Sequence, residues 1–108
     1  MKPLFQGVCT ALVTPFRLDF VHLEVYDQLL DRQLRAGGTA LVVCGTTGES
    51  ATMTDTERLD LIGHTVDYVR GRCKVIAGTG SNSTQTMLEK SQRAEKLGAD
   101  GLLLITPY

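Results

Sequence analysis

The segment most informative about the fold class is Leu41-Val42-Val43-Cys44-Gly45-Thr46-Thr47-Gly48-Glu49-Ser50. It begins as an apolar run and changes to two glycines that bracket two threonines, followed by a carboxylate. A helix start follows at Thr54, where Glu57 can complete a capping box. This order predicts a buried strand, a ligand-binding loop and a helix. In parallel α/β proteins such loops, at the carboxyl ends of the strands, hold small ligands.

The rest of the chain repeats this unit at intervals of about 30 residues, as expected for successive βα units. Expected strands cover residues 8–13, 40–44, 74–77 and 101–105, and expected helices cover residues 21–36, 54–71 and 84–98. The strands are apolar throughout rather than alternating, which indicates a parallel sheet covered on both faces. The sequence therefore predicts an α/β fold with about four parallel strands and three helices.

Two architectures begin in this way, the doubly wound open sheet and the (β/α)8 barrel. A doubly wound sheet favours a glycine-rich phosphate loop after its first strand, and residues 9–16 contain no glycine. Gly78-x-Gly80 lacks the third glycine of a dinucleotide fingerprint, and Gly45–Gly48 lacks the lysine of a phosphate loop. Polar groups instead follow every expected strand: Thr14; Thr46, Thr47 and Glu49; Thr79, Ser81 and Asn82; Thr106 and Tyr108. This recurrence predicts the amino-terminal half of a (β/α)8 TIM barrel.

A complete barrel of this class needs roughly 250 residues and eight strands. The 108 residues are therefore expected to form one partial barrel domain, 1–108, that ends after its fourth strand. Four residues are expected to line the barrel interior: Val42, Cys44, Ile76 and Leu103. The outer strands would expose unpaired edges, so the isolated chain is expected to aggregate or to assemble with a second copy.

Composition excludes several other classes of protein. The apolar fraction is 43%, the charged fraction is 21% and the net charge is −1, which gives no reason to expect nucleic acid or a membrane surface as a partner. The amino terminus lacks the apolar core of a signal peptide, so a cytoplasmic protein is expected. The wide spacing of Cys9, Cys44 and Cys73 predicts reduced thiols and no metal site.

The motifs together resemble the dihydrodipicolinate synthase family of pyruvate-dependent aldolases. The resemblance runs from Phe5 to the last residue and includes four segments: Thr10-Ala11-Leu12-Val13-Thr14-Pro15-Phe16, Gly45-Thr46-Thr47-Gly48-Glu49-Ser50, Val75-Ile76-Ala77-Gly78-Thr79-Gly80-Ser81-Asn82 and Thr106-Pro107-Tyr108. The resemblance implies a lyase, without a cofactor, that joins pyruvate as a lysine Schiff base to aspartate semialdehyde in lysine and diaminopimelate biosynthesis. It also implies a homo-oligomer, commonly a tetramer.

The resemblance assigns roles to residues of the quoted loop. It implies that Thr47 holds the pyruvate carboxylate through its hydroxyl and amide groups. It also implies that Thr46 passes a proton between tyrosines, and a hydroxyl suits this role because it both donates and accepts. Gly45, Gly48 and Glu49 are expected to support the loop, Glu49 through backbone amides.

The family's Schiff-base lysine has no match in this sequence. The lysines present are Lys2, Lys74, Lys90 and Lys96, and none is expected to be desolvated beside the Gly45–Gly48 loop. The chain alone is therefore expected to be inactive.

The resemblance also implies a regulatory lysine site that includes Ala51, Asn82 and Tyr108. Asp55 replaces the family's histidine there and Thr86 replaces its glutamate, which would pair with the ammonium of lysine. The sequence thus predicts weak or absent feedback by lysine.

Three alternatives remain open at this point. The chain could belong to another pyruvate-dependent aldolase, of the N-acetylneuraminate lyase or keto-deoxy-sugar type. It could be a non-catalytic half-barrel assembly module. It could also bind a nucleotide through Gly78–Asn82.

Overall fold

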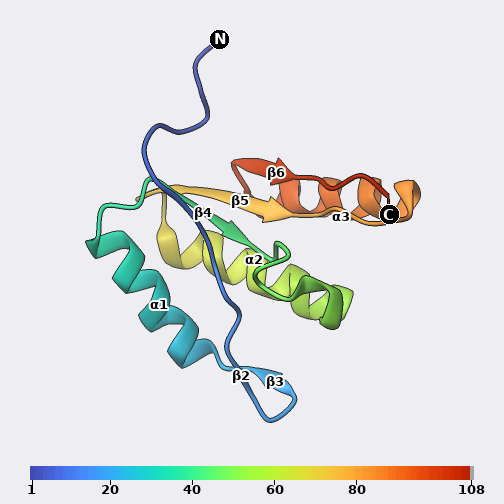
Figure 1. Ribbon diagram of the computed structural model, residues 1–108, viewed down its shortest axis with the longest axis horizontal. Coiled ribbons are helices and arrows are strands. Elements are labelled where there is room, and N and C mark those ends of the chain that lie inside the picture. The colour runs from blue at the N-terminus through green and yellow to red at the C-terminus, as the bar shows by residue number, and fades with distance from the viewer. Residues whose placement is uncertain (108) are drawn as a thin grey trace.

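The computed structural model describes residues 1–107. Its elements, in chain order, are β1 (Cys9–Ala11), β2 (Phe16–Arg17), β3 (Phe20–Val21), α1 (Leu23–Arg35), β4 (Ala40–Val43), the 3-10 helix η1 (Ser50–Thr52), α2 (Asp55–Val69), β5 (Lys74–Gly78), α3 (Thr84–Leu97) and β6 (Gly101–Leu103). Along the chain α2 lies between β4 and β5 and α3 between β5 and β6, and Figure 1 shows the three strands next to one another with these helices packed behind them. The predicted α/β order is confirmed.

The main sheet is parallel, and its strand order is β1-β4-β5-β6. Each strand pairs with the one before it in the βα series, for example with Leu41 opposite Val75 and Ala77 opposite Leu102. A doubly wound sheet reverses its strand order near the middle, and this sheet does not. The order agrees with the predicted half of a (β/α)8 barrel.

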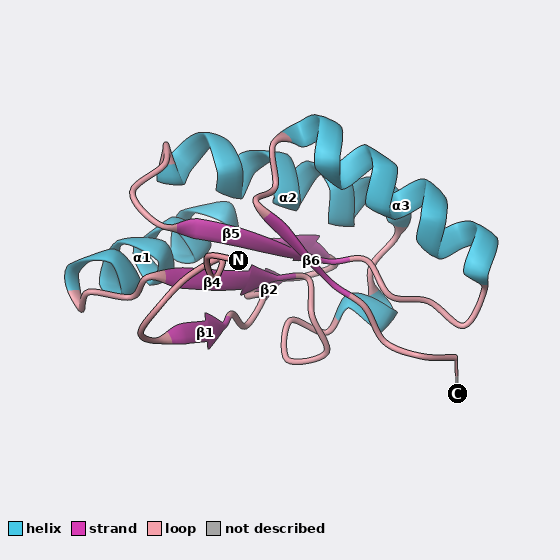
Figure 2. Cartoon of the chain, turned by 90° about the horizontal axis from the view of Figure 1, so that it is seen from above, coloured by secondary structure: helices cyan, strands magenta, loops and turns pink. Residues whose placement is uncertain are grey.

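Side chains of β4 and β5 alternate between two clusters on opposite faces of the sheet. Leu41, Val43, Val75 and Ala77 pack in one cluster with buried residues of all three helices. Ala40, Val42 and Ile76 form the other cluster, with Phe5 and Cys9 against it. Figure 2 shows α2 and α3 lying side by side above the strands. The helices therefore cover one face of the sheet, whereas both faces were expected to be covered.

The helix ends follow the predicted capping residues closely. The Thr54 hydroxyl accepts a hydrogen bond from the Glu57 amide at 3.1 Å, and the Glu57 carboxylate accepts one from the Thr54 amide at 2.8 Å. This is the predicted capping box. At the end of α3, Gly98 has φ 99°, a left-handed conformation that glycine adopts without steric cost.

We expect Thr54→Ala to lower the free energy of unfolding by about 1 kcal/mol, because it removes the cap of α2. Urea unfolding followed by circular dichroism measures this change. Thr84→Ala is the matched control: Thr84 is also an exposed threonine at a helix start, but the cap of α3 is Ser83. Equal effects of the two substitutions would contradict the capping role.

The sequence did not predict the two-stranded hairpin β2–β3, in which Phe16 pairs with Val21. Its turn places Leu18 at φ 57°, a left-handed conformation that leucine rarely adopts. The turn lacks glycine and asparagine, so it carries none of the residues that mark hairpins. Because Val21 belongs to β3, α1 begins at Leu23 and not near Val21 as expected.

Candidate functional site

The loop after β4 turns sharply as soon as the strand ends. Cys44 adopts φ 59°, and the amides of Gly48 and Ser50 both donate to the Gly45 carbonyl, at 3.1 and 3.4 Å. Side chains along β4 point alternately to the two faces of the sheet. The left-handed backbone at Cys44 breaks this pattern, so its side chain packs in the same cluster as that of Val43. Its thiol donates to the Arg58 carbonyl on α2 at 3.8 Å, and burial raises its pKa to about 12. The expectation that Cys44 lines the barrel interior is therefore wrong.

Gly78 lets β5 pass directly against this turn. A Cβ atom on Gly78 would lie 2.2 Å from the Cys44 carbonyl oxygen and 2.9 Å from the Gly45 nitrogen. Both are backbone atoms, which cannot swing aside as a flexible side chain can. The absence of a side chain at Gly78 thus sets the position of the threonine loop relative to the neighbouring strand.

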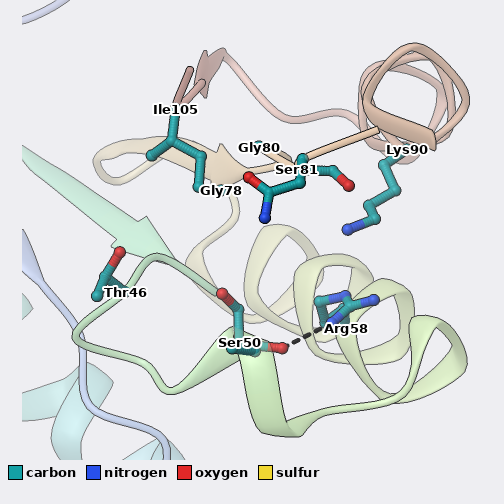
Figure 3. Close-up of a pocket in the computed structure, with 10 residues that line it drawn as sticks. Thr46, Ser50, Arg58, Gly78, Gly80, Ser81, Lys90 and Ile105 are labelled. Carbon is teal, nitrogen blue, oxygen red and sulfur yellow. Dashed lines mark hydrogen bonds between the residues drawn. The ribbon is translucent and has the colours of Figure 1, made fainter. Parts of the chain in front are cut away.

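A cavity of about 420 Å³ opens at the carboxyl ends of β4 and β5. It is lined by Thr46, Ser50, Ala51, Arg58, Gly78, Gly80, Ser81, Asn82, Lys90 and Ile105. In Figure 3, Thr46 and Ile105 lie on one side of the cavity, and Arg58 and Lys90 lie on the other. The loops that follow two neighbouring strands therefore meet at a common hollow.

The structure brings three of the predicted site residues together at this cavity, namely Thr46, Ala51 and Asn82. Thr47 is exposed on the same loop but does not line the cavity. Tyr108, the third residue of the predicted regulatory site, lies outside the described residues.

Gly45 and Gly48 are buried beneath the exposed threonines. A Cβ atom on Gly48 would lie 3.1 Å from the Leu12 carbonyl oxygen, so the loop packs closely on the end of β1. Glu49 was expected to brace the loop with its carboxylate. Its side chain is exposed, and it holds the loop through its backbone instead: its amide donates to the Thr46 carbonyl at 3.0 Å, and its carbonyl accepts from the Thr52 hydroxyl at 2.9 Å.

Arg58, which the sequence analysis did not single out, fixes the wall of the cavity. One guanidinium nitrogen donates to the carbonyls of Ser50 and Met53, at 2.6 and 2.7 Å. Another pairs with the Asp55 carboxylate, and this hydrogen bond lowers the pKa of Asp55. Arg58 therefore ties η1 to the first turns of α2.

The expectation that no lysine is desolvated near the loop needs a correction at Lys90, which lies across the cavity from Thr46. Lys90 lines the same cavity as Thr46, and burial, followed by the nearby Arg58 charge, lowers its pKa. The sequence does carry a sign of this placement. Lys90 lies three residues after Met87 and four before Ala94, two residues expected on the inner face of the helix.

Thr79 was expected among the polar groups at the ligand-binding edge. It is instead buried, and its hydroxyl lies 2.8 Å from that of Ser91 on α3. Thr79 therefore joins the helix to the strand and does not contribute to the cavity.

All three cysteines carry free thiols, and burial is the main cause that raises the pKa of each.

Over residues 1–107, no three side chains from histidine, cysteine, aspartate and glutamate gather closely enough to hold a metal ion. In the same part of the chain, no helix combines the length and apolarity that a membrane span needs.

Comparison with known proteins gives a consistent result. The model of the dihydrodipicolinate synthetase family matches residues 4–108. The chain is 50% identical over 105 residues to the 4-hydroxy-tetrahydrodipicolinate synthase of Thermotoga neapolitana, covering 97% of this chain and 36% of that relative.

Solved structures show the same likeness. The dihydrodipicolinate synthase of Thermotoga maritima superposes with a TM-score of 0.95 at 48% identity, over 98% of this chain and 36% of that one. The enzyme of Cyanidioschyzon merolae with lysine bound gives a TM-score of 0.92 at 44% identity, over 99% and 37%. The chain thus spans little more than a third of the length of these proteins. Because the family match runs through nearly every residue, the chain belongs to the dihydrodipicolinate synthetase family.

Proposed function

We propose that these residues supply the pyruvate-binding loop of a 4-hydroxy-tetrahydrodipicolinate synthase. The observation that carries the proposal is the Gly45–Ser50 loop, which presents two exposed threonines at the carboxyl ends of parallel strands in a member of this family. In the proposed reaction pyruvate condenses with a lysine and loses water, and the imine loses a proton to become an enamine that attacks the aldehyde of aspartate semialdehyde. The amino group of that substrate then attacks the imine carbon and displaces the lysine, which closes the ring and frees the enzyme. The product lies on the route to lysine, and the enzyme is proposed to be a homo-oligomer.

Thr47 has the groups that a carboxylate needs. Its hydroxyl can donate one hydrogen bond, and its backbone amide is a second donor in the same residue. The loop is rigid, because the Gly45 carbonyl accepts from both Gly48 and Ser50. A rigid pair of donors binds a carboxylate at little entropic cost.

Thr46 is placed for a different task. Thr46 lines the cavity, whereas Thr47 does not. A neutral hydroxyl that both accepts and donates can move a proton without placing a charge in the site. We assign Thr46 to proton relay and Thr47 to binding.

The Schiff-base lysine is proposed to be none of the four lysines of this chain. Lys74 begins β5 and so lies at the opposite end of the strand from the loop. Lys90 does line the cavity, but Figure 3 shows it beside Arg58, on the side away from Thr46. This position beside Arg58 supports the proposal that Lys90 is not the lysine that condenses with pyruvate.

We expect Thr47→Val to raise the KM for pyruvate by about tenfold, as the loss of one hydrogen bond to a charged group implies. Steady-state kinetics of the natural protein, at the length its gene encodes, measure this change. Thr56→Val is the matched control, because Thr56 is an exposed threonine on α2 that does not line the cavity. An unchanged KM in Thr47→Val would contradict the binding role.

A further inference from the structure

The cavity beside Thr46 is charged in a way that its role in the proposed reaction does not explain. Two cationic side chains line it, Arg58 from α2 and Lys90 from α3, and no carboxylate among residues 1–107 does so. Figure 3 shows the Lys90 amine directed toward the Arg58 guanidinium across the same side of the hollow. Like charges repel each other, and Asp55, which does not line the cavity, is a single carboxylate beside these two cations.

Arg58 is only partly neutralised by its surroundings. Asp55 pairs with it, but the Asp55 side chain is 59% exposed, whereas the Arg58 side chain is 14% exposed. The Arg58 Nε atom is buried and has no hydrogen-bond partner within the described residues. An unpartnered buried donor is costly and is uncommon in folded proteins.

Lys90 is only partly compensated, because the nearby Asp55 charge favours its positive form but is outweighed by burial and the Arg58 charge. Its ammonium makes no hydrogen bond or salt bridge within residues 1–107, and it is half-buried on the inner stripe of α3. Burial and the Arg58 charge both lower its pKa. Both effects disfavour the positive form of Lys90, and a bound anion would favour that form and raise the pKa again.

Polar groups that suit an oxyanion complete the lining. Ser50, Ser81 and Asn82 line the cavity beside the two cations. Ser81 and Asn82 also precede Ser83, the N-cap of α3, and so lie near the end of the helix where its dipole is positive. A volume of about 420 Å³ is sufficient for a small organic acid or a phosphate ion.

We propose that this cavity is a binding site for a small oxyanion, a carboxylate or phosphate group held between Arg58 and Lys90. The proposal goes beyond the synthase activity and does not depend on it, since binding can be measured without turnover.

The same charges explain which ligand the cavity should reject. Ala51 and Asn82, assigned by resemblance to a regulatory lysine site, line this cavity. The ammonium of free lysine would meet Arg58 and Lys90, and Thr86 supplies no carboxylate to pair with it. The site is therefore selective for anions over lysine.

Isothermal titration calorimetry on the natural protein, at the length its gene encodes, tests this site. The titrants are inorganic phosphate, succinate and L-lysine, each at the same fixed ionic strength so that nonspecific screening is constant. The variants are Lys90→Gln and the matched control Lys96→Gln, which removes the same charge from the exposed last turn of α3. Lys90→Arg keeps the charge and tests for rescue.

We expect phosphate or succinate to bind with a saturable one-site curve, and the stronger of the two identifies the anionic group. Lys90→Gln should weaken that binding by about tenfold, the value of one charge-assisted hydrogen bond, while Lys96→Gln leaves it unchanged and Lys90→Arg restores it. Three results would overturn the proposal: no saturable anion binding, equal weakening by Lys90→Gln and Lys96→Gln, or tighter binding of lysine than of either anion.

Discussion

Thr46→Val is expected to lower kcat by about a hundredfold and to change the KM for pyruvate little, because a proton relay contributes mainly to the chemical step. Valine has nearly the shape of threonine but cannot donate or accept a proton. The Thr46 side chain is exposed at the cavity, so its replacement removes no packing from the core. Steady-state kinetics on the natural protein measure both constants.

Two comparisons make this result specific. Thr46→Ser keeps a hydroxyl at the same place and should retain most of the activity. Thr56→Val changes an exposed threonine on α2 and should leave kcat unchanged. If Thr46→Val and Thr56→Val had the same kcat as the unmodified protein, Thr46 would have no part in proton transfer.

The second large effect is expected at Gly78. Gly78→Ala should lower the free energy of unfolding by about 3 kcal/mol, near the upper end of the range for overpacking. A Cβ atom there would lie 2.2 Å from the Cys44 carbonyl oxygen and 2.7 Å from the carbonyl carbon. Strand β5 or the threonine loop must then move, so the substitution should also reduce activity. Urea unfolding measures the loss of stability.

Gly63→Ala provides the matched control for Gly78→Ala. Gly63 lies within α2, and a Cβ atom there would meet only the Leu97 side chain, at 3.4 Å. Alanine forms helix better than glycine, so this variant should be more stable by up to about 1 kcal/mol. A Gly78→Ala protein as stable as Gly63→Ala would show that the close approach of β5 to Cys44 does not exist in solution.

The helices were predictable because their ends carry local chemistry. The Thr54 and Glu57 capping box and the left-handed Gly98 each act within a few residues, so the sequence alone identifies them. The strand order was predictable for a related reason, since consecutive βα units pair in sequence in a barrel. These local rules placed the threonine loop at the end of a buried strand.

The composition of the cavity was less predictable, because it depends on how two helices sit beside each other. Arg58 and Lys90 come from different helices, and neither segment by itself shows that the two side chains meet at one cavity. The positions expected for Cys44, in the barrel interior, and for Thr79, at the ligand-binding edge, were wrong for another reason. The left-handed backbone at Cys44 turns its thiol toward α2, and the hydroxyl of Thr79 finds a partner in Ser91.

We propose that the Gly45–Ser50 loop holds pyruvate for a lysine other than the four in this chain. Treatment of the natural protein with pyruvate and borohydride, followed by peptide mass spectrometry, tests this proposal. We expect one reduced pyruvate adduct, located on none of Lys2, Lys74, Lys90 and Lys96, and still formed in Lys90→Gln. An adduct on Lys90, or no adduct at all, would contradict the proposal.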